Sequence, residues 1–232
     1  MTVINFFLTR HGETQWNKIG KFQGQLDSPL TEKGISQARA IATHLMHINI
    51  KHIVSSTLPR AQKTAEICQT LLNSLLSLDS ALIERDFGHW QGKFINDVKR
   101  DDKYQDIFHQ VNNIAPQHGE SGIDCAKRFG QYLEKFASTY QDEGRNTNQR
   151  QVALGKPDSN INNILIVSHG DILRCFLTTM VDDFSDKNAM NTQAKSFDNG
   201  CIFQIRYDKN EQHFTLISTI DITKTPAEII EK

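Results

Sequence analysis

Two histidine-glycine pairs each follow a short apolar run that is typical of a buried strand. His11-Gly12 comes after Phe7-Leu8-Thr9-Arg10, and His169-Gly170 comes after Ile166-Val167-Ser168. In open α/β sheets, ligands bind at the carboxyl ends of the strands, so we expect the two pairs to meet at one site. A neutral imidazole can act as a nucleophile, and glycine lets the backbone turn sharply beside a ligand. The pattern favours chemistry on a bound anion.

Two arginines and a glutamate extend this candidate site. Arg10 precedes the first histidine, and Arg60 opens a helix after another apolar run. Arginine grips phosphate oxygens in a bidentate fork, and phosphoryl transfer depends mainly on positioning and charge neutralisation. We therefore predict that His11 is the nucleophile and that His169 is protonated among the phosphate oxygens. Glu84 is the expected general acid and then the general base for the hydrolytic water.

Other residues offer competing interpretations of the site. Glu13 and Glu120 are alternative acids, but we expect Glu13 to organise the first loop and Glu120 to lie at a helix start, where the dipole favours a carboxylate. His44, His47 and His52 lack acidic or thiolate partners, so a surface position is favoured over a metal site. We expect neither a metal ion nor a cofactor.

Short apolar runs alternate with stretches of helical period along the chain, which predicts an α/β fold with a mostly parallel central sheet and helices on both faces. The expected central strands are Ile4–Leu8, Ile53–Ser56 and Ile164–Ser168. Thr31 and Ser121 are expected helix caps, and Pro59 is expected in the first turn of another helix. The Pro59 helix should pack through Ala61, Ala65, Cys68, Leu71 and Leu75, and the helix Asp171–Val181 should follow the third strand.

The remaining segments complete a single three-layer domain over residues 1–232. Cys201–Tyr207 and Phe214–Ile220 predict an antiparallel hairpin at one edge of the sheet. Residues 142–163 are rich in Asn, Gln, Asp and Gly, which predicts a mobile loop. Residues 93–120 mix basic and aromatic side chains, which suits a lid over a site; the alternative is an ordinary solvated helix face.

These motifs occur in the order found in a known family. The ordered segments are Arg10 to Asn17, Phe22 to Gly34, Ser55-Ser56 with Arg60-Ala61 and Thr64-Ala65-Glu66, Glu84 with Phe87-Gly88, Gly119-Glu120-Ser121, and Ser168-His169-Gly170. In this set the chain resembles the histidine phosphatase superfamily, also called the phosphoglycerate-mutase-like proteins, over most of its length. A lone Arg-His-Gly would be weak evidence, whereas the ordered set is specific.

The resemblance implies a role for each matching residue. By this similarity His11 is the residue that is phosphorylated, Arg10, Arg60 and His169 complete the phosphate pocket, and Glu84 is the proton donor. Asn17, Gln23, Gly24 and Gly170 are expected to contact the phosphate or the bound substrate. The reaction implied is metal-independent.

The short segment after Glu84 bears on which reaction the resemblance implies. Cofactor-dependent mutases of the family carry a longer insert there, rich in Tyr, Arg and Lys, whereas this chain has the compact Asp86-Phe87-Gly88-His89-Trp90-Gln91-Gly92. This segment is similar to the small-molecule phosphatase branch, so hydrolysis of a phosphate monoester is the favoured function. The alternatives are a phosphoglycerate mutase and a phosphate- or phosphoprotein-binding relative without turnover. The natural substrate stays open.

Composition limits the partners that we expect. The chain has 26 basic and 27 acidic residues, for a net charge of −1, so no global field favours nucleic acid or a membrane surface. The four cysteines form no Cys-x-x-Cys pair, which fits reduced, buried thiols. The apolar run after Met1 lacks a basic start and is too short for a signal peptide or membrane span. We expect a cytoplasmic protein that acts on a small phosphorylated metabolite, with its oligomeric state open.

Overall fold

The computed structural model describes residues 3–140, 162–182, 184 and 197–222. These residues form a sheet with the strand order β3-β2-β4-β1-β6-β7-β5. The strands are β1 Val3–Arg10, β2 Ile50–Ser56, β3 Leu75–Asp79, β4 Asn162–Ser168, β5 Val181–Asp182, β6 Cys201–Asp208 and β7 His213–Asp221. Strands β3, β2, β4 and β1 are parallel, and β6 is antiparallel to both β1 and β7.

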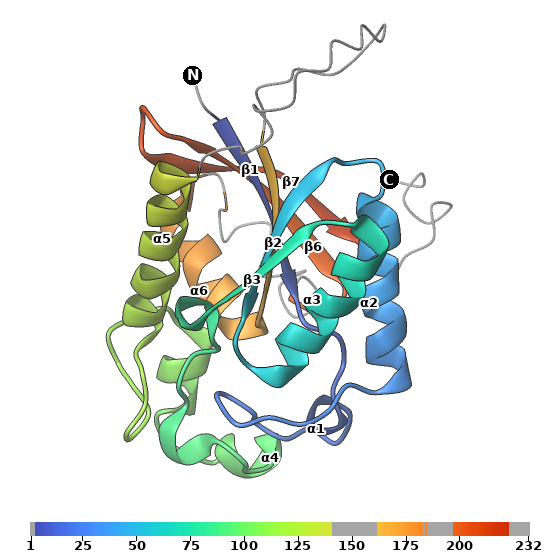
Figure 1. Cartoon of the computed structure of the whole chain (residues 1–232). Coiled ribbons are helices and arrows are strands. Elements are labelled where there is room, and N and C mark those ends of the chain that lie inside the picture. The colour runs from blue at the N-terminus through green and yellow to red at the C-terminus, as the bar shows by residue number, and fades with distance from the viewer. Residues whose placement is uncertain (1–2, 141–161, 183, 185–196, 223–232) are drawn as a thin grey trace, which may run out of the picture.

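Helices cover both faces of this sheet, as Figure 1 shows. Helices α2 (Glu32–Leu45) and α3 (Pro59–Leu72) pack on one face, and α5 (Gly122–Thr139) and α6 (Gly170–Met180) pack on the other. Successive side chains of a strand point to opposite faces, so Phe6 and Leu8 of β1 enter the α5/α6 core while Phe7 enters the α2/α3 core. The predicted three-layer α/β architecture is confirmed.

Local capping explains where the long helices begin. The side-chain oxygen of Thr31 accepts a hydrogen bond from the N–H of Gly34 at 3.0 Å, and that of Ser121 accepts one from Asp124 at 3.1 Å. Pro59 lies in the first turn of α3, where its missing N–H leaves no bond unmade. All three predicted helix starts are confirmed, and α6 begins and ends one residue earlier than expected.

The end of α3 corrects the sequence-based interpretation. The helix stops at Leu72 because Asn73 adopts a left-handed conformation, with φ of 51°. Leu71 and Leu75 were expected on the buried face of the helix, but both are exposed. Leu75 instead begins β3, an edge strand that the periodicity did not predict.

The predicted antiparallel hairpin at one side of the sheet is confirmed. It comprises β6 and β7, but β6 is hydrogen-bonded along β1 inside the sheet, and the short β5 runs parallel to β7 beyond it. Most of the predicted loop 142–163 lies outside the described residues. Its last two positions, Asn162 and Asn163, belong to β4.

The 93–120 segment lies beside the carboxyl ends of the parallel strands, with α4 near the bottom of Figure 1. It contains α4 (Ile95–Val98) and a π-helical turn, η3 (Gln105–His109); the other short elements are α1 (Gln15–Lys18), η1 (Ser80–Leu82) and η2 (Gly88–Trp90). The basic side chains of this segment are exposed, as predicted by the alternative of a solvated helix face. They are Lys93, Lys99, Arg100, Lys103 and His118. Its apolar side chains form a third core cluster with Phe22, Phe87 and Trp90.

Candidate active site

The two histidine-glycine pairs meet because their strands are neighbours in register. Arg10 of β1 is paired with Ser168 of β4, and the N–H of His11 donates to the carbonyl oxygen of Ser168 at 3.0 Å. The His11 and His169 rings are both buried, and their centroids lie 5.1 Å apart. The expectation that parallel pairing brings the two rings together is confirmed.

Hydrogen bonds define which nitrogen of His11 carries the lone pair. Nδ1 lies 2.8 Å from the carbonyl oxygen of Gly12, which can only accept, so Nδ1 carries the proton. The Nε–H of Arg60 donates to Nε2 at 3.1 Å, so Nε2 is the acceptor. Burial, and then the charges of Arg60 and Arg10, lower the pKa of His11 well below 6.5. A neutral ring with its lone pair on Nε2 is the nucleophilic form.

The protein surroundings of His169 favour its neutral form, whereas its predicted protonation concerns the ring among phosphate oxygens. Burial, and then the charges of Arg60, His11 and Arg10, lower the pKa of His169 well below 6.5, so these surroundings favour the neutral ring. Its Nε2 lies 2.8 Å from the Oγ of Ser56, which itself accepts from the N–H of Leu58. If the Ser56 hydroxyl donates to Nε2, the proton resides on Nδ1. His169 can then donate a hydrogen bond without being charged.

The two arginines approach His11 from different elements. Arg60, in the first turn of α3, donates through Nη1 to the carbonyl oxygen of Leu26 at 2.7 Å and through Nη2 to that of Gly24 at 2.6 Å. Gly24 has a φ of +54°, which disfavours any side chain. Arg10 donates to the carbonyl oxygen of Phe197 at 3.0 Å, and a Cβ on Gly170 would lie 3.3 Å from its guanidinium carbon.

Buried polar atoms beside His11 indicate where a ligand belongs. The Nε of Arg10 and the Nδ1 of His169 are buried and have no hydrogen-bond partner among the described residues. Buried polar groups in folded proteins are almost always hydrogen-bonded, so an unpartnered pair at one site calls for a polar partner from outside the chain. An anion with several acceptor oxygens satisfies both.

The carboxyl group of Glu84 lies against the first turn of α6. Its carboxylate oxygens accept from the N–H groups of Asp171 at 3.2 Å and Ile172 at 2.9 Å. The Oγ of Ser168 donates to the carbonyl oxygen of Leu82 at 2.8 Å, which fixes this segment at the end of β4. Burial raises the pKa of Glu84 and the Asp171 carboxylate raises it further, against the opposing effect of the backbone N–H groups.

The first loop is held by a network around Thr14. The N–H and Oγ1 of Thr14 both lie 3.1 Å from the Oδ1 of Asn17, and Oγ1 also lies 3.1 Å from the Oε1 of Gln23. These bonds engage the amide oxygens of Asn17 and Gln23. Their NH₂ groups therefore remain the donors with which either residue could contact a phosphate.

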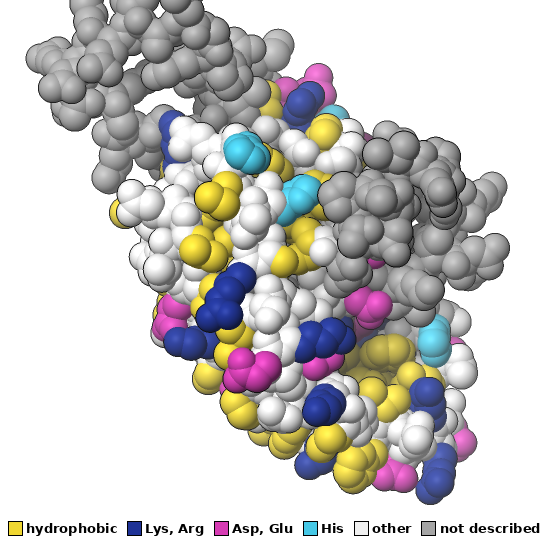
Figure 2. Space-filling view, turned by 90° about the vertical axis from the view of Figure 1, so that its right-hand side faces the viewer, with side chains coloured by type: hydrophobic (Ala, Val, Ile, Leu, Met, Phe, Trp, Pro, Cys, Tyr) yellow, Lys and Arg dark blue, Asp and Glu magenta, His cyan; other side chains and the backbone are white. Residues whose placement is uncertain are grey.

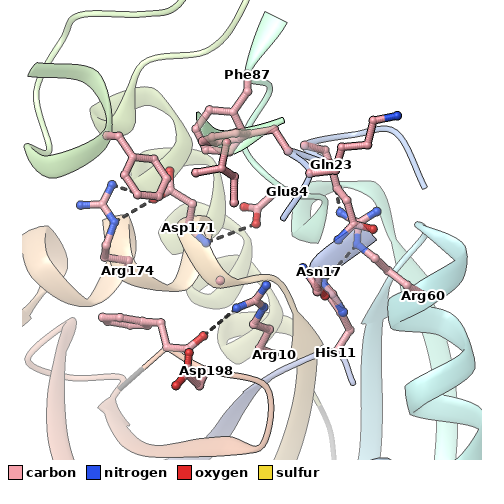
Figure 3. A pocket seen from close by; sticks show the side chains of 17 residues that line it. Arg10, His11, Asn17, Gln23, Arg60, Glu84, Phe87, Asp171, Arg174 and Asp198 are labelled. Atoms are coloured by element: carbon pink, nitrogen blue, oxygen red, sulfur yellow. Dashed lines mark hydrogen bonds and ion pairs between the residues drawn. The ribbon is translucent and has the colours of Figure 1, made fainter. Parts of the chain in front are cut away.

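These residues surround a pocket of about 340 Å³, drawn in Figure 3. It is lined by the predicted residues Arg10, His11, Asn17, Gln23, Gly24, Arg60, Glu84 and Gly170. His169 is not among the residues that line the pocket, but its ring lies 5.1 Å from that of His11, which does line it. Other residues that line the pocket were not predicted as site residues. They are Lys21, Phe22, Phe87, Ile95, Phe108, Asp171, Arg174, Phe197 and Asp198. Asp171 and Arg174 follow His169-Gly170 at helical spacing, which could have signalled them; the others converge through long-range packing.

A buried ion network connects this pocket to the 93–120 segment. Arg85 is fully buried and pairs with the Asp171 carboxylate at 3.2 Å, while Arg174 pairs with the other oxygen of Asp171 at 2.7 Å. Arg85 also donates to the carbonyl oxygens of Ile107 at 2.9 Å and Glu120 at 2.9 Å. One guanidinium therefore joins the start of α6 to the segment that borders the pocket.

The alternative residues occupy other positions. Glu13 accepts from Thr31 at 2.9 Å and Lys33 at 3.0 Å, and Glu120 forms a bidentate pair with Arg128. His44 and His47 are exposed. Among the described residues, no group of three or more His, Cys, Asp or Glu side chains is arranged to hold a metal ion. The four cysteines are free and buried, as predicted.

The molecular surface carries mixed charge. On the face seen in Figure 2, basic and acidic side chains of the described residues lie interspersed. This face therefore offers no single-sign field that would attract an anion. None of the helices within the described ranges is long and apolar enough to cross a membrane.

Known proteins resemble the chain in both sequence and fold. Residues 6–219 match a family described as the histidine phosphatase superfamily (branch 1). The probable phosphoglycerate mutase GpmB of Escherichia coli O139:H28 is 32% identical over 182 residues, which cover 77% of this chain and 75% of that protein. YhfR of Bacillus stearothermophilus has a TM-score of 0.68 at 26% identity, covering 92% of this chain and 95% of its own. A mycobacterial glucosyl-3-phosphoglycerate phosphatase has a TM-score of 0.70 at 23% identity, covering 92% and 97%.

Proposed function

Because the chain belongs to branch 1 of the histidine phosphatase superfamily, we propose that it is a phosphatase that hydrolyses small-molecule phosphate monoesters through a phosphohistidine on His11. The observation that carries this proposal is the state of His11: a neutral ring whose Nε2 lone pair borders the pocket, held by the Gly12 carbonyl and flanked by Arg10 and Arg60. A carboxyl group, Glu84, faces the same pocket (Figure 3).

In the first half-reaction, Nε2 of His11 attacks phosphorus and the bond from phosphorus to the ester oxygen breaks. The Nε–H of Arg60 then donates its hydrogen bond to a phosphoryl oxygen instead of to Nε2 of His11. The Nε–H of Arg10 and the Nδ1–H of His169 donate hydrogen bonds to the other phosphoryl oxygens. The leaving alkoxide takes the proton of Glu84, whose raised pKa favours the protonated carboxyl. In the second half-reaction Glu84 accepts a proton from water, the resulting hydroxide attacks phosphorus, and neutral His11 leaves with release of inorganic phosphate.

The test is turnover of an activated aryl phosphate, such as p-nitrophenyl phosphate, in the presence of a chelator. The wild type should release phosphate, and His11→Ala should lose at least roughly a thousandfold in kcat. Trapped wild-type enzyme should carry an acid-labile, base-stable phosphoryl group. Equal rates in the two proteins would refute the nucleophile and leave a binding relative, whereas loss of wild-type activity with chelator would point to a metal.

A mutase is the second candidate, because the 32% identical relative is named a probable phosphoglycerate mutase. The discriminating experiment supplies 3-phosphoglycerate with bisphosphoglycerate and follows both isomerisation and free phosphate. Efficient isomerisation with little phosphate would favour the mutase. We expect phosphate release instead, since the segment Asp86 to Gly92 after Glu84 is short and forms only η2.

The free, buried cysteines support action in the reducing cytoplasm.

A further inference from the structure

The side of the pocket beyond Glu84 is built from aromatic rings. The Phe22 ring contacts those of Phe87 and Phe108 edge-on, with centroids 5.1 Å and 5.6 Å apart, and the Phe87 and Phe108 centroids are 6.3 Å apart. Trp90 packs behind Phe22 at 5.9 Å, and Tyr104 stacks on Phe108 at 5.3 Å. Because each ring is held by at least two others, the wall is preformed.

Two further apolar side chains, Ile95 and Phe197, extend this lining. Ile95 comes from α4, and Phe197 lies next to Asp198, which Figure 3 shows across the pocket from Phe87. The carbonyl oxygen of Phe197 holds Arg10, so this residue is placed directly beside the phosphate end. A leaving group that extends from a phosphoryl group on His11 therefore meets apolar surface.

The cations near this wall are already engaged. Arg174 is bound to Asp171 at 2.7 Å, and its guanidinium carbon lies 5.8 Å from the centroid of Phe108, so it extends the ring wall. The Lys21 ammonium lies 4.3 Å from the centroid of Trp16, which is outside the pocket lining. A carboxylate or second phosphate on the leaving group would compete with Asp171 and with these rings for the two cations, whereas an uncharged ring leaves the contacts of both cations as they are.

Resting on the proposed function, we propose that the substrate is a phosphate monoester whose leaving group carries an uncharged aromatic ring that packs on Phe22, Phe87 and Phe108. The pocket volume of about 340 Å³ is at the small end of ligand sites, which run from roughly 300 to 1,000 Å³, and so fits a compact leaving group. The same wall disfavours phosphoglycerates, whose carboxylate would face the rings.

The test compares esters whose leaving alkoxides are similarly basic, so that bond cleavage is equally demanding. 2-Phenylethyl phosphate should exceed propyl phosphate about 10- to 100-fold in kcat/KM, the factor that burial of a ring supplies. Glycerol 3-phosphate and 3-phosphoglycerate should not exceed propyl phosphate. Phe108→Ala should reduce the ratio of phenylethyl to propyl rates, and Phe108→Leu, which keeps apolar bulk, should reduce it less.

The matched control is Phe94→Ala. Phe94 belongs to the same segment but is 50% exposed and lies outside the pocket lining, so the ratio should stay at its wild-type value. Equal rates for phenylethyl and propyl phosphate, or faster turnover of 3-phosphoglycerate, would overturn this inference while leaving a His11-dependent phosphatase intact. Failure to hydrolyse any ester, p-nitrophenyl phosphate included, would overturn the proposed function and this inference together.

Discussion

Burial acts on the pKa values of His11 and Glu84 in opposite directions, yet to the same chemical end. It lowers the pKa of the imidazole and raises that of the carboxyl group, because a charged form is disfavoured in either case. Attack by His11 requires the neutral ring, and protonation of the leaving group requires the neutral acid. Burial therefore favours both groups in the form that the proposed first half-reaction requires.

The proton-donor role of Glu84 is tested by Glu84→Gln. Transfer from a basic alkoxide needs a proton, so its first-turnover rate should fall about 10²- to 10⁴-fold, whereas p-nitrophenolate leaves without one and its first turnover should fall far less. Rapid-quench kinetics separates this first turnover from the hydrolysis of the phosphoenzyme, which also uses Glu84. Equal losses on both esters would contradict a proton-donor role.

The charge of Asp171 is expected to influence the pH at which activity declines on the alkaline side. For an alkyl phosphate, kcat/KM should fall as pH rises through the pKa of Glu84, because the acid form is lost. The Asp171 carboxylate raises that pKa, so Asp171→Asn should move the alkaline limb to lower pH. Asp198→Asn, an exposed position in the same lining, is the control and should leave the limb in place. A limb that stays, or moves to higher pH, in Asp171→Asn would refute this coupling.

At the scale of elements, the end of the pocket at His11 was predicted residue by residue from sequence, whereas the opposite end was predicted only as a lid over residues 93–120. His11, His169 and Glu84 belong to contiguous motifs at strand or helix ends, and parallel pairing brings such ends together. The ring wall instead joins Phe22 to Phe108, which are distant in sequence and meet only through packing. The end of α3 was missed because a left-handed Asn73, and not a change of apolar period, terminates the helix.

Arg85 is expected to anchor the 93–120 segment to α6. Replacing it by Met leaves Asp171 with one cation fewer and removes a donor from buried carbonyl groups, so Arg85→Met should lower the free energy of unfolding by roughly 3–5 kcal/mol. Urea denaturation measures this loss, and hydrogen exchange should quicken within 105–120. Arg100→Met removes an exposed pair with Asp97 and should cost less than about 1 kcal/mol. Similar costs for both variants would argue against the anchor.

At the scale of the whole molecule, the side chains that form the hydrophobic cores and those that line the candidate site lie at different parts of the sheet. Its two faces are covered by α2 with α3 and by α5 with α6, and these two cores provide most of the buried apolar surface. The candidate site lies at the carboxyl ends of β1 and β4, where Arg10, His11 and Gly170 line the pocket. At that end of the sheet His11, Arg60, Glu84 and His169 are buried beside the two cores.

This desolvation predicts how stability depends on pH. His11 and His169 have a pKa well below 6.5 in the folded protein, so the unfolded chain binds more protons once the pH falls below that value. Their contribution is fully present above pH 6.5 and is lost as the pH falls toward the folded values, at about 1.4 kcal/mol per histidine and pH unit. The free energy of unfolding of a His11→Gln, His169→Gln double variant, measured by urea denaturation, should therefore fall less than that of the wild type between about pH 7 and pH 5.5. Replacing the exposed His44 and His47 by Gln gives the matched control variant. Parallel curves for wild type and the His11/His169 variant would show that the two rings do not resist protonation as their burial requires.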